Sequence, residues 1–153
     1  MKLNKQWINK FDPCEEGIEW LEAQDERDGV KIVKKLIKEN KLDWANWTIV
    51  TLMKRKQYLR YAIYAAEQVI DIFEKKYPKD DRPRKAIETA KAVVKKDSKS
   101  NRKKADATRA AAGYAAGYAA WTACWDAAWT AAGDAMQTKI LRYALKLLEG
   151  SNG

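Results

Sequence analysis

The segment AAGYAAGYAAWTACWDAAWTAAGD, residues 111–134, divides into the four-residue units AAGY, AAGY, AAWT, ACWD, AAWT and AAGD. Because four residues exceed one helical turn of 3.6, equivalent positions advance about 40° per unit and form slowly winding ridges. Alanine has the highest helix propensity, and two adjacent alanine ridges allow a second helix to cross closely at about 50°. The segment therefore predicts a long Ala-rich helix over 101–149, around which other helices pack.

One ridge of this helix carries Trp121, Trp125 and Trp129. Small apolar residues occupy most of the circumference, which favours a helix surrounded by others, with the indoles in the core. The alternative is an exposed aromatic strip, and such a strip would be a binding site for a partner.

Asp126 and Asp134 lie on the next ridge. We expect both to be buried polar residues, and a buried carboxylate requires a cation, several hydrogen-bond donors or a raised pKa. The interpretations are a structural ion pair with Arg60, Arg109 or Arg142, a functional acidic site, and simple exposure. Eight residues along one helix separate the two carboxylates by about 12 Å, too far for a pair that acts on one bond.

The rest of the chain has the pattern of amphipathic helices. Periodic apolar residues predict helices at about 13–24, 30–40, 44–54, 56–76 and 84–96, and no segment alternates like a strand. The expected N-caps are Asp12, Asp43 and Asp81, with Ser100 or Asn101 for the last helix. The expected buried stripes of the third and fourth helices are Trp44, Trp47 and Val50, and Tyr58, Ala62, Ala65, Val69, Ile72 and Phe73. We predict an all-α fold in which residues 1–153 form a single-domain bundle of about six helices around the long Ala/Trp-rich C-terminal helix.

The charge of the chain is uneven. Lys and Arg number 30 against 21 Asp and Glu, a formal net charge of +9, and the excess lies between Lys54 and Lys104. A basic helical pair is expected at 55–96. Such a region suits nucleic acid, an acidic protein or an anionic membrane, or it forms only solvated helix faces.

Several classes of function are excluded by composition. The chain has no histidine, so catalytic triads with an imidazole base and HExxH metal sites are excluded. Cys14 and Cys124 are far apart and form no metal-spaced pair, so we expect no metal, no cofactor and no enzymatic activity. MKLNKQWINKFDP lacks the apolar core of a secretory signal, and the uncharged run 110–125 is shorter than a membrane span of about 20 residues. We expect a cytoplasmic protein without a membrane partner.

The stretch RYAIYAAEQVIDIFEKKYPKDDRPRKAIETAK, residues 60–91, is followed by NRKKADATRAAAGYAAGYAAWTA and LRYALKLLEG. The order of these segments, over about residues 42–150, resembles that of a family of helical immunity proteins of bacterial toxin loci and phages. The resemblance implies a protein that binds and neutralises a toxin. Many immunity proteins are acidic because they cover basic nuclease sites, whereas this chain is basic, which favours an acidic target or a defence complex.

The first hypothesis is therefore a non-enzymatic inhibitor that binds a protein effector through the basic middle of the chain. Arginines there would make bidentate contacts to carboxylates or phosphates. The candidate partner-binding residues, expected to come together at the ends of two helices, are Lys54, Arg55, Lys56, Tyr77, Arg82, Arg84 and Lys85. The alternative is a nucleic-acid-binding accessory protein that uses the same region with Lys95, Lys96 and residues 102–104. A structural role for the Ala/Thr helix at an ice surface is a third interpretation, and the oligomeric state stays open.

Overall fold

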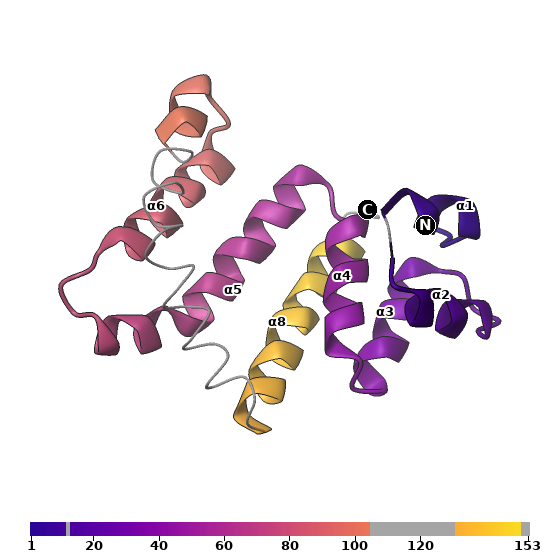
Figure 1. Cartoon of the computed structure of the whole chain (residues 1–153). Helices are drawn as coiled ribbons and strands as arrows, with labels where there is room; N and C mark the ends of the chain where they lie inside the picture. Colours follow the sequence, from indigo (N-terminus) through magenta and orange to yellow (C-terminus); the bar gives the residue numbers. More distant parts are fainter. Residues whose placement is uncertain (12, 105–130, 151–153) are drawn as a thin grey trace. The chain divides into compact units, whose positions relative to one another are not determined.

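The computed structural model describes residues 1–11, 13–104 and 131–150 (Figure 1). Its elements are α1 (Lys5–Ile8), the 3-10 helix η1 (Asn9–Phe11), α2 (Glu15–Glu22), α3 (Gly29–Lys38), α4 (Leu42–Leu52), α5 (Arg55–Lys76), α6 (Arg82–Lys95) and α8 (Ala131–Glu149). Residues 99–104 are helical as well. The described ranges contain no strand beyond an isolated bridge between Lys2 and Asp28. The prediction of an all-α fold is confirmed, whereas α1 and η1 were not predicted.

The chain forms two compact units. The first comprises Met1–Lys54 with Leu141–Gly153, and the second comprises Arg55–Ile140. The predicted cap at Asp12 and the tetrad residues before Ala131, with Trp121, Trp125 and Trp129, lie outside the described residues. None of the helices described is long and apolar enough to span a bilayer.

The core of the first unit is built by helices from both ends of the chain. Asp28 caps α3 by accepting hydrogen bonds from the backbone amides of Val30 (3.1 Å) and Lys31 (3.2 Å). Lys34 Nζ of α3 lies 2.7 Å from Glu149 Oε1 of α8, which adds an exposed ion pair. The buried apolar residues are Leu3, Ile8, Leu21, Ile32, Val33, Leu36, Leu42, Ala45, Ile49, Leu141, Ala144, Leu145 and Leu148.

The second unit contains α5 packed beside α6. The turn at residues 77–81 joins these two helices (Figure 1). Tyr61, Ile70, Phe73 and Val93 are buried, and burial raises the pKa of Tyr61 to about 12. Proline at position 83 lies in the first turn of α6, where its missing amide leaves no helical hydrogen bond unmade.

Three of the predicted caps are wrong. α4 begins at Leu42, two residues earlier than expected, so Asp43 lies inside its first turn and Lys41 takes the N-cap position, without a side-chain cap hydrogen bond. Asp81 occupies the N-cap position of α6, but its helical backbone (φ −89°, ψ −1°) lacks the extended conformation that directs a cap side chain toward the helix amides. Asp80 accepts from the amide of Arg82 instead. Ser98, rather than Ser100 or Asn101, accepts from the amide of Asn101.

The predicted buried stripes are also only partly correct. In α4 the buried residues are Leu42, Ala45, Thr48 and Ile49, whereas Trp44 and Trp47 are half-buried. In α5 Phe73 is buried, but Tyr58 and Ile72 are exposed by 48% and 44%. Both helices carry apolar residues at spacings of three and four on more than one face. The spacing alone therefore does not identify the face that packs inward.

Candidate functional site

The α5–α6 turn brings four of the predicted binding residues into one part of the second unit. Arg84 Nη2 lies 2.6 Å from Glu74 Oε2, and its Nε donates to the other oxygen of the same carboxylate. Arg82 binds Asp80 with both Nε (2.8 Å) and Nη2 (2.7 Å). These are bidentate pairs, the geometry that arginine favours with carboxylates.

Lys85 and Tyr77 complete this group. Lys85 Nζ lies 2.7 Å from Asp81 Oδ2, four residues earlier along the chain. Tyr77 is exposed by 39%, and its ring centre lies 5.1 Å from that of Phe73. Lys76 Nζ lies 5.7 Å from the ring of Tyr77, within the range of a cation–π interaction. We call Tyr77, Arg82, Arg84 and Lys85 the turn surface.

The ion pairs set the electrostatics of the turn surface. Hydrogen bonds from Arg84 hold the pKa of Glu74 below its ordinary value, and those from Arg82 do the same for Asp80. The pKa of Lys85 is raised by its hydrogen bond with Asp81. The cations and Asp81 are largely exposed, whereas the side chains of Glu74 and Asp80 are exposed by 33% and 19%. Ion pairs of exposed cations contribute little to stability, because water competes for both partners. A partner carboxylate can therefore replace an internal one at low cost.

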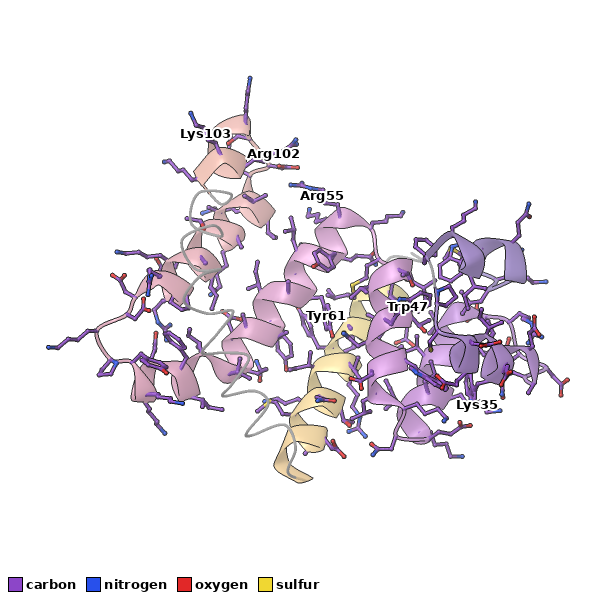
Figure 2. The ribbon with its side chains drawn as sticks, viewed as in Figure 1. Lys35, Trp47, Arg55, Tyr61, Arg102 and Lys103 are labelled. Atoms are coloured by element: carbon purple, nitrogen blue, oxygen red, sulfur yellow. The ribbon has the colours of Figure 1, made fainter. Side chains whose placement is uncertain are left out.

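The other predicted residues lie elsewhere. Arg55, at the beginning of α5, contacts Asp97 beyond the end of α6, with 2.8 Å between Nη1 and Oδ2. Arg102 donates to both oxygens of the same carboxylate, at 2.6 and 3.0 Å, and Figure 2 shows Arg55 and Arg102 near one another. The 22 residues of α5 span about 33 Å, so Arg55 lies at the opposite end of the helix pair from Arg82 and Arg84.

The prediction of one cluster of seven residues is therefore wrong. Lys56 follows Arg55 at the beginning of α5, and Lys54 belongs to the first unit. The physical reason is the length of α5. In an antiparallel pair such as α5 and α6, the end of the first helix lies close to the beginning of the second. The beginning of the first helix then lies one helix length away from that turn.

The predicted acidic residues are not a buried pair in the described structure. Asp134 is exposed in the first turn of α8, contrary to our expectation of burial. Exposure leaves the carboxylate hydrated and avoids the large cost of transferring a charge to an apolar core. Asp126 lies outside the described residues. In the part of the chain that the structure describes, no three His, Cys, Asp or Glu side chains are grouped so that they could hold a metal ion.

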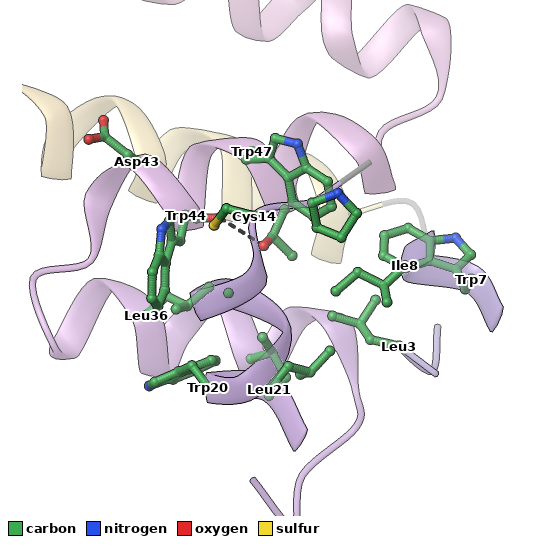
Figure 3. Close-up of a pocket in the computed structure, with 14 residues that line it drawn as sticks. Leu3, Trp7, Ile8, Cys14, Trp20, Leu21, Leu36, Asp43, Trp44 and Trp47 are labelled. Atoms are coloured by element: carbon green, nitrogen blue, oxygen red, sulfur yellow. Dashed lines mark hydrogen bonds between the residues drawn. The ribbon is translucent and has the colours of Figure 1, made fainter. Parts of the chain in front are cut away.

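The sequence analysis missed a pocket in the first unit. A cavity of about 350 Å³ opens between α1, α2 and α4 (Figure 3). We call it the tryptophan pocket, because four indoles form much of its wall. It is lined by Leu3, Trp7, Ile8, Pro13, Cys14, Gly17, Trp20, Leu21, Ile32, Leu36, Asp43, Trp44, Trp47 and Thr48.

Neighbouring groups hold the indoles of the pocket in place. Trp20 Nε1 donates a hydrogen bond of 2.9 Å to Glu39 Oε2, and the Trp20 ring meets that of Trp44 edge to face, with 6.3 Å between centres. Lys41 Nζ lies 4.5 Å from the ring centre of Trp44. Phe11 makes a further edge contact with Trp47 at 6.3 Å. These contacts preorganise aromatic walls before any ligand binds.

The pocket combines apolar walls with one carboxylate. Asp43 is the one charged residue among those that line it. α2 brings further negative charge, because every charged residue from 12 to 26 is acidic. Two signals in the sequence point to this site: that acidic run in a basic chain, and the four tryptophans at positions 7, 20, 44 and 47.

Comparison with known proteins gives one result. A family model described as "Imm-5 like putative immunity protein" matches residues 48–151. No curated protein and no solved structure gives a match. The matched range contains α5, α6 and the turn surface, and it confirms the resemblance carried by residues 60–91.

Proposed function

Since the chain belongs to the Imm-5 like immunity protein family, we propose that it binds a protein effector, a toxin or a defence component, and neutralises it by occupying its surface. The action is stoichiometric and involves no turnover. The observation that carries this proposal is the family match over residues 48–151, about two thirds of the chain. We further propose a cytoplasmic site of action.

The turn surface is the proposed contact site for the effector. It combines an exposed tyrosine with two arginines, and Tyr and Arg are enriched among the residues that dominate binding energy at interfaces. Ile72 of α5, five residues before Tyr77 in the chain, is also exposed, by 44%. An effector with an acidic face fits this site, because its carboxylates would replace Glu74 and Asp80 as the partners of the arginines.

Charge reversal tests this contact site. After the effector has been identified by purification of the tagged protein from its native host, its Kd is measured for the wild type and for the triple variant Arg82→Glu, Arg84→Glu, Lys85→Glu. Loss of a dominant interface residue costs about 2 kcal/mol or more, so we expect the affinity to fall at least about 30-fold.

The matched control makes the same change in charge at the other predicted residues, as Lys54→Glu, Arg55→Glu, Lys56→Glu. Arg55 and Lys56 lie at the beginning of α5, at the opposite end of this helix from the turn surface, and Lys54 belongs to the other unit. We expect the control to bind within about threefold of the wild type. Equal losses in both triple variants would indicate a general charge effect, and unchanged affinity in the first would exclude the turn surface.

Nucleic-acid binding is the second candidate function. Exposed cations follow one another from the end of α6 into the next helical segment: Lys95, Lys96, Lys99, Arg102, Lys103 and Lys104. Asp97 neutralises part of this charge through its pair with Arg102. An electrophoretic mobility shift whose affinity falls steeply between 50 and 200 mM salt, in the absence of any protein partner, would support this candidate over the first.

A further inference from the structure

We propose that the tryptophan pocket is a binding site for a small organic ammonium ion with an aromatic or branched apolar body. The site lies in the first unit, whereas the turn surface belongs to the second, and of the residues that line the pocket only Thr48 falls within the range matched by the family. The proposal is therefore independent of effector binding, and each can fail without the other.

The dimensions and walls of the pocket suit a small ligand. Its volume of about 350 Å³ lies at the lower end of the range for small-molecule sites, which are concave and mostly apolar with a few polar groups. Trp20, Trp44 and Trp47 approach it from α2 and α4, while Leu3 and Ile8 close the other side (Figure 3). An apolar body placed between these rings leaves water and gains dispersion contacts.

The charge of the ligand follows from what surrounds this apolar space. The face of an indole carries partial negative charge and attracts a cation within about 6 Å of its centre, with Trp the best of the aromatic residues. Lys41 already uses the ring of Trp44 in this way at 4.5 Å, although Lys41 does not line the pocket. The structure thus contains an internal example of the interaction that a ligand ammonium would make.

Asp43 and α2 add long-range attraction for a cation. Asp43 is one of the residues that line the pocket, and its exposed carboxylate points away from the tryptophans in Figure 3. The exposed Glu15, Glu16 and Glu19 lie on the helix that supplies Gly17 and Trp20. The net charge of +9 belongs mainly to the middle of the chain. At physiological salt the Debye length is about 8 Å, so only the charges close to the pocket act strongly on a bound ligand. Lys41 opposes the ligand, and its removal should strengthen binding.

Benzyltrimethylammonium is the test probe. It is titrated into the full-length protein while the indole N–H signals of the ¹H–¹⁵N NMR spectrum are followed, each assigned by a Trp→Phe variant. We expect the signals of Trp20, Trp44 and Trp47 to shift in a saturable manner. The neutral benzyl alcohol and the anionic phenylacetate are the matched ligands, and we expect them to bind at least about tenfold more weakly.

Substitutions of single residues locate the site, and circular dichroism of each variant checks its fold. Asp43→Asn should weaken binding of the cation about threefold to tenfold and leave benzyl alcohol unaffected, whereas Lys41→Met should strengthen it. Asp25→Asn, which removes an exposed carboxylate of the same unit outside the pocket lining, is the matched control and should change the Kd less than twofold. Trp44→Leu keeps an apolar wall but removes the ring, and should reduce the preference for the cation.

Two outcomes would overturn the proposal. If benzyl alcohol binds as tightly as the cation, the pocket is only an apolar cavity. If the shifts of the three indoles do not saturate, or if Asp43→Asn and Asp25→Asn behave alike, the cation does not bind at this site. Neither result would bear on effector binding at the turn surface.

Discussion

Gly29 begins α3 at a place where two other segments approach closely. A Cβ atom at this position would lie 2.9 and 3.0 Å from the two Cδ atoms of Leu52 and 3.2 Å from the carbonyl oxygen of Met1. The amide of Gly29 donates a hydrogen bond of 2.8 Å to that same oxygen, so the backbone cannot retreat without breaking it. The φ angle of Gly29 is not positive, so its backbone conformation does not call for glycine. The close approach of Leu52 and Met1 is the reason for glycine at this position.

The first prediction is that Gly29→Ala destabilises the first unit. Insertion of one methyl group into such a tight contact costs about 1–3 kcal/mol, and urea unfolding followed by circular dichroism measures the loss. Gly17→Ala is the control. Its Cβ would meet only Sγ of the exposed Cys14, at 3.1 Å, and alanine is about 1 kcal/mol better than glycine inside a helix. Equal losses in the two variants would contradict the steric explanation for Gly29.

Glu26 is held in its ionised form by its neighbours. The backbone amide of Asp28, the side chain of Lys31 and the amide of Arg27 all donate to it, and together they lower its pKa from 4.5 to about 2. A carboxylate whose pKa is lower in the folded state stabilises the fold above its unfolded pKa. That stability is lost as the pH falls through the pKa that the carboxylate has in the folded protein.

The second prediction follows from the lowered pKa of Glu26. Glu26→Gln should be less stable than the wild type at pH 7, and the difference should shrink as the pH falls below 4.5 and vanish at or below pH 2. Urea unfolding midpoints of both proteins across this range measure the difference. A difference that stays constant with pH would show that the effect of Glu26 is not electrostatic.

At the scale of the element, α5 shows how tertiary packing selects one face of a helix. Ile72 and Phe73 are adjacent apolar residues, yet Ile72 is exposed by 44% and Phe73 by 5%. A step of one residue turns a side chain by about 100°, which is enough to move it from the core to the solvent. The ring of Phe73 also contacts that of Tyr77, so the buried face supports the turn surface.

The third prediction uses these neighbours as a matched pair. Phe73→Ala should reduce the free energy of unfolding by about 3–5 kcal/mol, because it leaves a cavity, whereas Ile72→Ala should change it by less than about 0.5 kcal/mol. Thermal or urea unfolding of the two variants measures both values. A larger loss for Ile72→Ala would mean that the opposite face of α5 is buried in solution.

At the scale of the whole molecule, the first unit depends on a segment from the far end of the chain. Leu141 and Leu145 of α8 are exposed by only 2% and 8%, and they belong to the same unit as Met1–Lys54. Lys34 and Glu149 add an exposed ion pair between α3 and α8. The N-terminal helices and the tryptophan pocket are therefore not expected to be stable without the end of α8.

The fourth prediction tests this dependence. Leu141→Ala should destabilise the first unit by about 2–5 kcal/mol and broaden the indole N–H signals of Trp20, Trp44 and Trp47, although residue 141 is distant from all of them in sequence. Lys146→Ala, at an exposed position of the same helix, is the control and should leave both observables nearly unchanged. Unchanged indole signals in Leu141→Ala would contradict the assignment of α8 to this unit.

The charge of the molecule also has to be considered unit by unit. The net charge of +9 suggests one basic protein, but the acidic run at 12–26 lies in the first unit and the basic region lies mainly in the second. The two proposed sites accordingly suit ligands of opposite charge: an acidic effector at the turn surface and a small cation in the tryptophan pocket. Interactions of exposed charges are screened over about 8 Å, so the charges next to each site matter most for its ligand.

Helix content and most helix positions could be predicted from the sequence alone. Spacings of three and four, together with Tyr77-Pro78 and Asp28-Gly29 as interruptions, place α3, α5 and α6 within one or two residues of the observed bounds. The resemblance at residues 60–91 also identified the family. These features are local, because helix propensity, proline and glycine act on neighbouring residues without any knowledge of the fold.

The grouping of residues across helices was decided only by tertiary structure. The sequence showed which residues were basic, but the length and antiparallel pairing of α5 and α6 placed Arg55 with Asp97 and left Arg84 with Glu74. Likewise, Trp44 and Trp47 were predicted as core, but α1, α2 and α4 enclose a cavity that both residues line. A helix with apolar residues on several faces carries no local information about its partners, so burial is settled only when all helices pack together.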